Sequence, residues 1–284
     1  MVSNIILVDS SYTSFYRFFA TMRWYSLAHM EEYKKYKDDN TYDWSQNEIF
    51  IEKYKKMYLD SIIHLVTKNV YNDSKIVFCL DAPQASLWRK ELSQCYKGNR
   101  VDVTEKYNIK PVFKLTYTTL IPNLIKENKN IYMISKPRME ADDIIALATR
   151  YIRYKKTKLN IYLVSGDNDF LQLGFDRLYF ADYKKKECFQ LNKIEAKLAL
   201  EQKIINGDCS DNIPSIFPKE EKISNKLRKL IKENKSELIK YLHENKIAKE
   251  QFEHNKKMIS FKYIPKNLRQ QVYKEIKVIL KRSF

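Results

Sequence analysis

The sequence predicts an α/β fold with a doubly wound, mostly parallel sheet and a basic α-helical C-terminal region. Three observations lead to this prediction. Short apolar runs are continuous rather than alternating, segments of helical length separate them, and the pattern becomes helical throughout after Asn192. Continuous apolar runs are typical of parallel strands that helices cover on both faces. With 284 residues, the chain is long enough to bury such a core without disulfides or a structural metal.

Each predicted strand is a short apolar run bounded by polar or turn-forming residues. The predicted strands are 5–8, 76–80, 131–134 and 161–164, with 178–180 as a weaker fifth.

The predicted helices fall into two groups, one between the strands and one after them. Pro218 and Pro265 are expected to mark helix boundaries in the second group. The helices expected between strands are 47–70, 112–126 and 141–154, and those expected afterwards are 192–205, 221–232, 235–245, 248–258 and 266–281.

Charge divides the chain into two expected regions. The formal net charge is +17, and residues 219–284 contain 19 Lys or Arg against 8 Glu. Every aspartate lies at or before Asp211. We therefore expect an α/β catalytic domain at 1–214 and a basic helical region at 215–284 that binds a polyanion, for which nucleic acid is the natural candidate.

Other classes of protein are disfavoured by the composition. The four cysteines have no CxxC spacing and the four histidines are scattered, so neither a zinc site nor a disulfide framework is expected. A metal would have to be held by oxygen. The N-terminal segment has no basic region before its apolar run, and no stretch is long enough to cross a membrane. We expect a cytoplasmic protein that is not secreted and has no membrane partner.

Acidic residues follow the predicted strands at the points where the strands end. Because the carboxyl ends of parallel strands meet at one edge of a sheet, these side chains should converge there. The residues are Asp9 after the first strand, Asp81 after the second, Glu140, Asp142 and Asp143 after the third, and Asp167 and Asp169 after the fourth.

A further acidic pair, Asp208 and Asp211, is spaced so that both carboxylates can face one point if the turn is helical. Taken singly, each acidic motif could instead be a helix cap or a turn. Gathering so many like charges is costly, however, and hard divalent cations relieve that cost. The set predicts two Mg²⁺ ions that hydrolyse a phosphodiester bond. Asp9, Asp81, Glu140 and Asp142 would hold the first ion and Asp167, Asp169, Asp208 and Asp211 the second, with Asp143 between them or in an outer shell.

A basic segment at about 84–111 follows the second predicted strand and Asp81, and it is expected to form an exposed loop or a helical segment that projects from the sheet. Lys97 and Arg100 lie one turn apart and could position the scissile phosphate. Trp88, Arg89 and Tyr96 are candidates for contact with nucleic acid, because aromatic rings can stack on unpaired bases. The alternative is an ordinary solvated basic face.

These motifs resemble the flap endonuclease and 5′ to 3′ exonuclease family, and their order and spacing match over nearly the whole chain. Within it, Trp88-Arg-Lys90 and Phe261-Lys-Tyr-Ile-Pro265 are similar to the T-even bacteriophage ribonuclease H group. The family motifs are Asp9, Phe78-Cys-Leu-Asp81, Tyr96-Lys-Gly-Asn-Arg100, Glu140-Ala-Asp-Asp143, Ser165-Gly-Asp-Asn-Asp169 and Gly207-Asp-Cys-Ser-Asp-Asn-Ile-Pro214.

The resemblance implies a PIN-like 5′-nuclease core with a helical arch and two Mg²⁺ ions, for which Mn²⁺ could substitute. It implies that DNA and RNA/DNA hybrids with 5′ flaps or ends are cut during DNA replication, with RNase H-type primer removal. A single-strand binding protein and a sliding clamp are candidate partners, and a monomer is the default. A phage or viral source is implied, and with it the cytoplasm of a bacterial host.

One departure from the family concerns the grip on duplex. Many members follow the Ser-Asp-Asn-Ile-Pro motif with a glycine-rich hairpin and a bound K⁺, whereas residues 215–219 contain no glycine. The K⁺-assisted contact is therefore in doubt, and Lys219, Lys222 and Lys226 are expected to contact phosphates directly. Two other functions remain open, a PIN-type ribonuclease and a catalytically silent module that binds DNA junctions. The basic helical tail disfavours the first, and the complete acid set disfavours the second.

Overall fold

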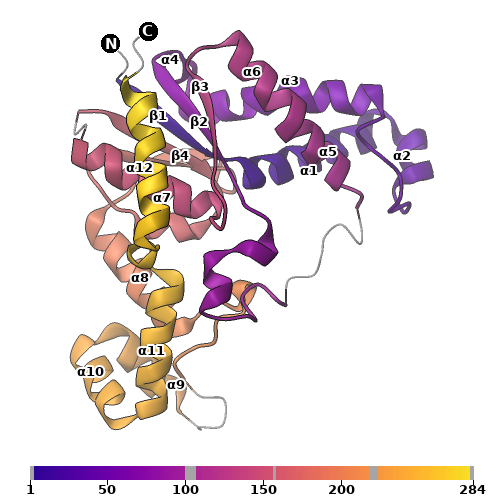
Figure 1. The fold of residues 1–284 in the computed structure, drawn as a ribbon. Coiled ribbons are helices and arrows are strands. Elements are labelled where there is room, and N and C mark those ends of the chain that lie inside the picture. The colour runs from indigo at the N-terminus through magenta and orange to yellow at the C-terminus, as the bar shows by residue number, and fades with distance from the viewer. Residues whose placement is uncertain (1–2, 100–106, 156–157, 218–222, 282–284) are drawn as a thin grey trace.

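The computed structural model describes residues 3–99, 107–155, 158–217 and 223–281, which include a six-stranded sheet. The sheet lies in the upper part of the view in Figure 1. The strand order is β3-β2-β1-β4-β5-β6; the first five strands are parallel and β6 is antiparallel to β5. The predicted fold class is confirmed. The strands are β1 Asn4–Asp9, β2 Ser74–Leu80, β3 Ile131–Ser135, β4 Asn160–Ser165, β5 Leu178–Asp182 and β6 Glu187–Gln190.

β6 is the one strand among the described residues that the sequence did not predict. Three of its four residues are exposed, so it carries no continuous apolar run. It lies at the edge of the sheet and pairs only with β5. An edge strand of this kind leaves too weak a hydrophobic signal to be recognised.

The central strand β1 is buried on both faces of the sheet, which explains its continuous apolar sequence. Ile5 and Leu7 pack into one core with residues of α7 (Ala141–Lys155) and α12 (Lys266–Lys281), whereas Ile6 and Val8 face α1 (Ser10–Ala28) and α3 (Glu48–Val66). The chain runs outward from β1 to β2 and β3, and then returns to β4 on the other side of β1. This reversal creates a switch point at the carboxyl ends of β1 and β4, where ligands bind in such sheets.

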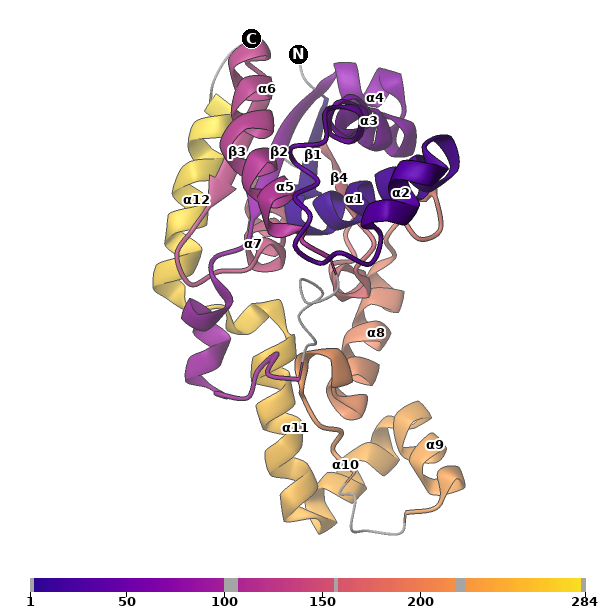
Figure 2. The same ribbon diagram turned by 90° about the vertical axis from the view of Figure 1, so that its right-hand side faces the viewer.

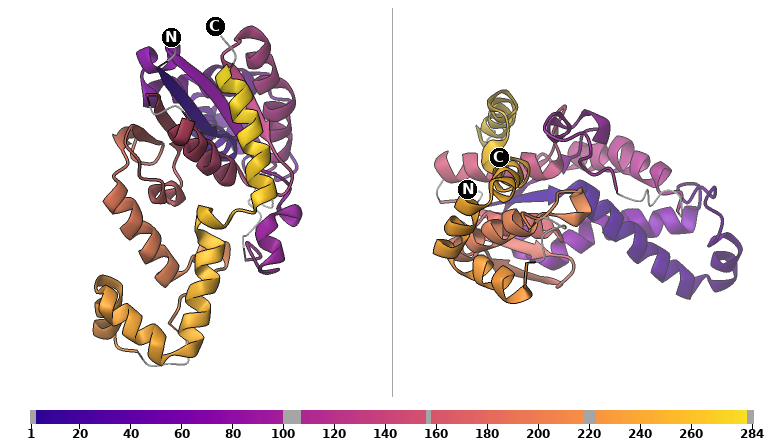
Figure 3. Two further views of the ribbon diagram at one scale, coloured as in Figure 1. Left: turned by 60° about the vertical axis from the view of Figure 1, so that its left-hand side comes forward. Right: turned by 90° about the horizontal axis from the view of Figure 1, so that it is seen from below.

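The remaining helices cover the sheet or project from it (Figures 2 and 3). None of the helices in the described part of the chain is both long and apolar enough to cross a membrane. The remaining α-helices are α2 Met30–Tyr36, α4 Lys68–Asn72, α5 Lys110–Leu115, α6 Ile121–Glu127, α8 Lys193–Asn206, α9 Asn225–Glu233, α10 Lys235–Glu244 and α11 Lys246–Ile259.

Helices α1 and α2 were not predicted. The buried side of α1 includes Ser14, Arg17 and Thr21, so polar residues interrupt its apolar periodicity. The Ser14 and Thr21 hydroxyls donate to backbone carbonyls one turn earlier in the helix. Burial of these groups is tolerated because their hydrogen bonds are made locally.

The last helix returns to the sheet instead of staying with the basic helices that precede it (Figure 1). α12 packs on α7, and Leu268, Val272 and Ile276 belong to the same core as β1. The buried Lys75 ammonium donates to the carbonyl of Ile279 at 2.8 Å. The predicted division at residue 214 therefore does not separate two cores, because α8–α11 form the projection and α12 belongs with the α/β layer.

The predicted arch at about 84–111 is described at residues 84–99 and 107–111. The first part contains two short 3-10 helices and turns, and the second part includes the start of α5. The two 3-10 helices are η1 (Gln84–Ser86) and η2 (Trp88–Glu91). Residues 100–106 lie outside the described part of the chain.

Candidate active site

The first group of acids lies at the switch point of the sheet. Asp9 ends β1 and caps α1, where its Oδ1 accepts a hydrogen bond from the amide of Tyr12 at 3.0 Å. Its Oδ2 accepts from the hydroxyl of Ser165, the last residue of β4, at 2.8 Å. Asp9 is only 5% exposed. Neighbouring strand ends therefore fix the orientation of this carboxylate.

The start of α7 is joined to the end of β2 by an acid. Asp81 Oδ1 accepts a hydrogen bond from the amide of Ala141, the first residue of α7, at 2.6 Å. This contact holds Glu140 and Asp142 beside Asp81. A hollow of about 290 Å³ results, and the groups that line it include Asp9, Asp81, Lys97, Glu140, Asp142 and Asp167.

Burial and repulsion from neighbouring carboxylates raise the pKa values of two acids of this first group, Asp9 and Asp142. Burial and then the charge of Asp81 raise the pKa of Asp9 to about 7. Burial, followed by the charges of Asp167 and Asp9, raises the pKa of Asp142 well above its ordinary value. Such a cluster favours bound cations, and its purely oxygen donors suit a hard divalent ion such as Mg²⁺. The donor set therefore fits the metal that the sequence predicts.

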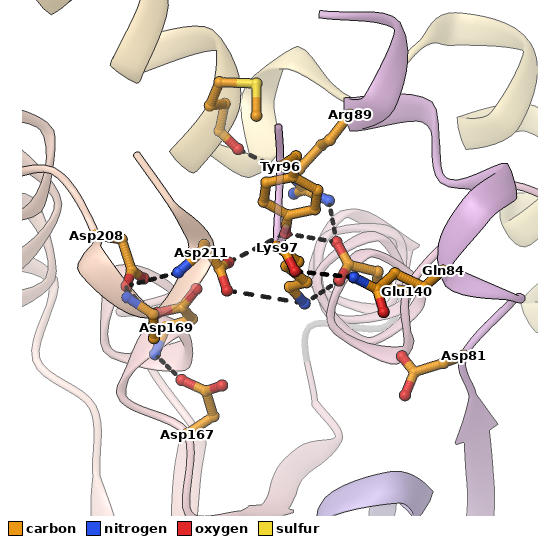
Figure 4. Close-up of polar contacts among 12 residues, drawn as sticks. Asp81, Gln84, Arg89, Tyr96, Lys97, Glu140, Asp167, Asp169, Asp208 and Asp211 are labelled. Atoms are coloured by element: carbon orange, nitrogen blue, oxygen red, sulfur yellow. Dashed lines mark hydrogen bonds and ion pairs between the residues drawn. The ribbon is translucent and has the colours of Figure 1, made fainter. Parts of the chain in front are cut away.

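A second group consists of Asp169, Asp208 and Asp211, which offer carboxylate oxygens within 4.8 Å of one another (Figure 4). The Lys203 ammonium lies between Asp169 and Asp208, 2.7 Å from Asp208 Oδ2. Burial raises the pKa of Asp208, but its hydrogen bonds with Lys203 and Ser210 bring that pKa below the ordinary value. An ammonium among these acids compensates the charge that a divalent ion would neutralise more fully.

The turn after η2 places cationic and hydroxyl groups between the two acid groups (Figure 4). The Lys97 ammonium pairs with Glu140 and lies 4.0 Å from Asp211 Oδ1. The Tyr96 hydroxyl donates to Glu140 Oε2 at 2.9 Å and to Asp211 Oδ2 at 3.1 Å. Burial raises the pKa of Glu140, but the charges of Arg89 and Lys97 bring it below its ordinary value.

The structure corrects the expectation that Trp88 and Arg89 face nucleic acid, because both are at least 96% buried. Trp88 Nε1 donates to Asp143 Oδ2 at 2.8 Å, and the Arg89 guanidinium donates to both oxygens of Asp143 and to Glu140. The pairing satisfies charges that would otherwise be buried alone. Tyr96 is also buried, so its ring is not open for stacking on a base.

Asp143 differs from the other eight predicted ligands. It is 0% exposed and lies behind Glu140, where it accepts from Trp88 and Arg89. In this place Asp143 supports Arg89 and, through it, Glu140, and its assignment to the outer shell of the metal site stays a prediction.

The other predicted residues fall in several places. Arg100, Lys219 and Lys222 lie outside the described residues. Lys226 is exposed on α9, and other cations of the same helix, Arg228, Lys229 and Lys232, help to line a hollow.

Sequence reasoning missed Lys203 and Ser165, two side chains that hold the acids. A single lysine on a helix of a lysine-rich chain gives no signal of its own. Ser165 was quoted in a motif, but only its place at the end of β4 shows that it bonds to Asp9.

A comparison with known families decides the assignment. The model described as "5'-3' exonuclease, N-terminal resolvase-like domain" matches residues 4–199. The chain belongs to the 5′-3′ exonuclease family. Residues 4–199 include the first acid group and Asp169 of the second.

Curated relatives of this 5′-3′ exonuclease family member are partial matches. The 5′-3′ exonuclease of Buchnera aphidicola subsp. Schizaphis graminum is 30% identical over 166 residues, which cover 56% of this chain and 53% of the relative. The ribonuclease H of Enterobacteria phage T4 is 24% identical over 173 residues, covering 57% and 55%. The matched part spans about half the length of these relatives.

Solved structures match over a longer stretch. The bacteriophage T5 5′-exonuclease with bound zinc has a TM-score of 0.64 and 18% identity, with 98% of this chain and 100% of that chain covered. The T5 flap endonuclease in complex with DNA and metal ions has a TM-score of 0.61 at the same identity and coverage. At this identity the likeness shows a shared fold, which includes the helical C-terminal part.

Proposed function

We propose that this 5′-3′ exonuclease family member is a Mg²⁺-dependent 5′ nuclease that hydrolyses phosphodiester bonds with two metal ions. One observation carries the proposal: two groups of carboxylates face each other across Lys97 and Tyr96 at the switch point of the sheet. Family membership supports the same class of reaction.

Each acid group would hold one ion. Asp9, Asp81, Glu140 and Asp142 would bind the first, and Asp169, Asp208 and Asp211 the second. Asp167 lines the hollow of the first group, while its Oδ1 accepts from the amide of Asp169 at 2.9 Å, so it belongs between the two. Bound there, Mg²⁺ would polarise the scissile phosphate and offset the charge that develops on it.

The protein's own cations would act on the same phosphate. Lys97 lines the hollow, so its ammonium can leave Glu140 for a phosphate oxygen when metal neutralises the acids. Arg100 is proposed for the same phosphate. Tyr96 would keep Glu140 and Asp211 aligned through its hydroxyl.

The proposed substrates are DNA and RNA/DNA hybrids with 5′ flaps or ends, cut during replication in the cytoplasm of a cell or host. The names of the relatives and the T5 complex with DNA support this class of substrate. Exposed cations on α9, with Lys219 and Lys222, would contact duplex phosphates. A single-strand binding protein and a sliding clamp are proposed as assisting partners.

The test uses end-labelled 5′-flap substrates in DNA and RNA versions, incubated with Mg²⁺, Mn²⁺ or EDTA. We expect cleavage in either metal and none in EDTA. Asp167→Asn should abolish cleavage and leave binding intact. Asp176→Asn is the matched control, because Asp176 is an exposed acid whose partner is Arg153. Undiminished cleavage by Asp167→Asn would overturn the metal assignment, and cleavage in EDTA would overturn the proposed chemistry.

A further inference from the structure

Lys97 has a backbone conformation that is unfavourable for residues other than glycine. Its φ is 56°, in the left-handed region. It occupies the third position of a tight turn in which the amide of Gly98 donates to the carbonyl of Cys95 at 2.9 Å. A glycine is usual at a third turn position with positive φ, because a Cβ is strained there. A lysine in this place needs surroundings that hold it.

Both backbone polar groups of Lys97 are held from outside the turn. Its amide donates to the carbonyl of Asp211 at 3.0 Å. Its carbonyl accepts a hydrogen bond from the side-chain amide of Gln84 at 3.0 Å. Gln84 lies in η1, three residues after Asp81, so the two contacts join Lys97 to Asp211 of the second acid group and to the segment that follows Asp81 of the first.

Two more side-chain amides tie the same turn to the loop of the second acid group. Asn99 Nδ2 donates to the carbonyl of Cys209 at 2.7 Å, and Asn212 Nδ2 donates to the carbonyl of Cys95 at 2.9 Å. We call Gln84, Asn99 and Asn212 the turn bracket. Each member donates to a backbone carbonyl, and the three contacts join the turn that contains Lys97 to neighbouring segments.

We propose that the turn bracket positions Lys97 for catalysis, with Gln84 as the positioning residue that ties the lysine to the first acid group. This inference rests on the proposed function. The bracket fixes the backbone, while the Lys97 side chain folds past the Tyr96 ring toward Glu140. The ammonium is thereby aimed at the space between the two acid groups, where a scissile phosphate would lie. Without Gln84, the turn can relax to a negative φ and carry the ammonium away.

The experiment compares Gln84→Ala with Gln94→Ala on a 5′-flap substrate in Mg²⁺. Gln94 is the matched control, an exposed glutamine of the same segment whose side chain is not part of the bracket. Gln84→Ala removes one hydrogen bond, and we expect it to lower kcat about fivefold. KM should stay within about twofold of the parent value, because Lys97 acts at the transition state. Gln94→Ala should match the parent protein. Equal kcat values for the two variants would overturn the proposal.

A double-mutant cycle separates positioning from direct contact. In a Lys97→Ala background, Gln84→Ala should cause no further loss of kcat, because the group that it positions is gone. A further fivefold loss in that background would overturn the proposal and assign Gln84 to the substrate instead.

A stability measurement tests the strained turn without any cleavage. Both Lys97→Gly and Lys97→Ala remove the ammonium, but only glycine accepts the positive φ without strain. We expect Lys97→Gly to melt about 2 °C above Lys97→Ala, because relief of about 1 kcal/mol of backbone strain shifts the Tm of a large chain by roughly that amount. A Tm for Lys97→Gly that is equal to or lower than that of Lys97→Ala would contradict the inference that the turn is strained. Absence of cleavage by the parent protein would instead refute the proposed function. The Tm comparison would then still test whether the turn at Lys97 is strained.

Discussion

The hydroxyl of Ser165 donates a 2.8 Å hydrogen bond to Oδ2 of Asp9, so the ends of β4 and β1 are joined at the point where the strand order reverses. Ser165 is 0% exposed, and its oxygen also accepts from the amide of Asp167 at 3.2 Å. One hydroxyl thereby holds the Asp9 carboxylate of the first acid group and the backbone of Asp167, which lies between the two groups.

Ser165→Ala should weaken metal binding about tenfold, because supporting hydrogen bonds orient ligands and tune their affinity. The measurement is the Mg²⁺ concentration for half-maximal cleavage, alongside calorimetric titration of the protein alone. Ser26→Ala is the control, since that exposed hydroxyl bonds only to the carbonyl of Arg23 in its own helix. Unchanged metal affinity for Ser165→Ala would show that the strand junction does not tune the site.

The stability of the metal-free protein should fall as pH rises from about 4 to about 7. The pKa of Asp9 is 3.8 ordinarily and about 7 when folded, so the folded state binds more protons between these values. The stabilising contribution is complete below the lower value and lost as pH passes the upper one. We expect a lower Tm at pH 8 than at pH 5 in EDTA, and recovery at pH 8 when Mg²⁺ is added.

The variant Asp9→Asn removes the titrating group and should flatten this pH dependence in EDTA. It should also reduce the recovery that Mg²⁺ produces. An equally steep loss of Tm in Asp9→Asn would assign the effect to other groups.

Arg89→Ala should destabilise the fold by about 3 to 5 kcal/mol, because it leaves Asp143 and Glu140 buried without their cation. Urea denaturation measures the loss. Arg153→Ala provides the contrast, because its partner Asp176 is exposed and such a pair contributes about 1 kcal/mol or less. Similar losses for both variants would show that the buried network is not a structural anchor.

Gly166→Ala should disturb the site through Tyr12. A Cβ at position 166 would lie 2.2 Å from the Tyr12 hydroxyl oxygen and 2.4 Å from the ring carbon that bears it, so the ring must move. Tyr12 lines the hollow of the first acid group, and we expect a lower Tm and slower cleavage. In a Tyr12→Ala background, Gly166→Ala should lower the Tm much less than it does in the parent protein, because the ring that it displaces is gone. An equal loss of Tm in both backgrounds would mean that the backbone at residue 166, and not the ring, sets the requirement for glycine.

The sequence predicts the features that depend on neighbours along the chain. Strands such as β1 and β4 have continuous apolar runs at their centres, so the sequence predicts both the strands and the acids at their ends. It also predicts helices with uniform periodicity, such as α12. Contacts between distant segments are not readable. Trp88 and Arg89 are residue types typical of an exposed nucleic-acid contact. In the structure both are buried, because they donate hydrogen bonds to Asp143, which lies more than 50 residues later in the sequence. The positive φ of Lys97 likewise depends on Gln84 and Asp211, which only the folded chain brings together.

The packing of α12 on α7 means that α7 cannot complete its packing until the C-terminal end of the chain has been synthesised. α7 begins at the acids of the site, and its outer side is covered by α12, with Tyr151 and Tyr273 in ring contact at 5.1 Å. On the ribosome, more than 100 residues are added between the end of α7 and the start of α12. During that interval α7 can pack on β1, β2 and β3, but the side that α12 covers has no partner, so the packing of the helix that presents Glu140 and Asp142 is completed late in translation.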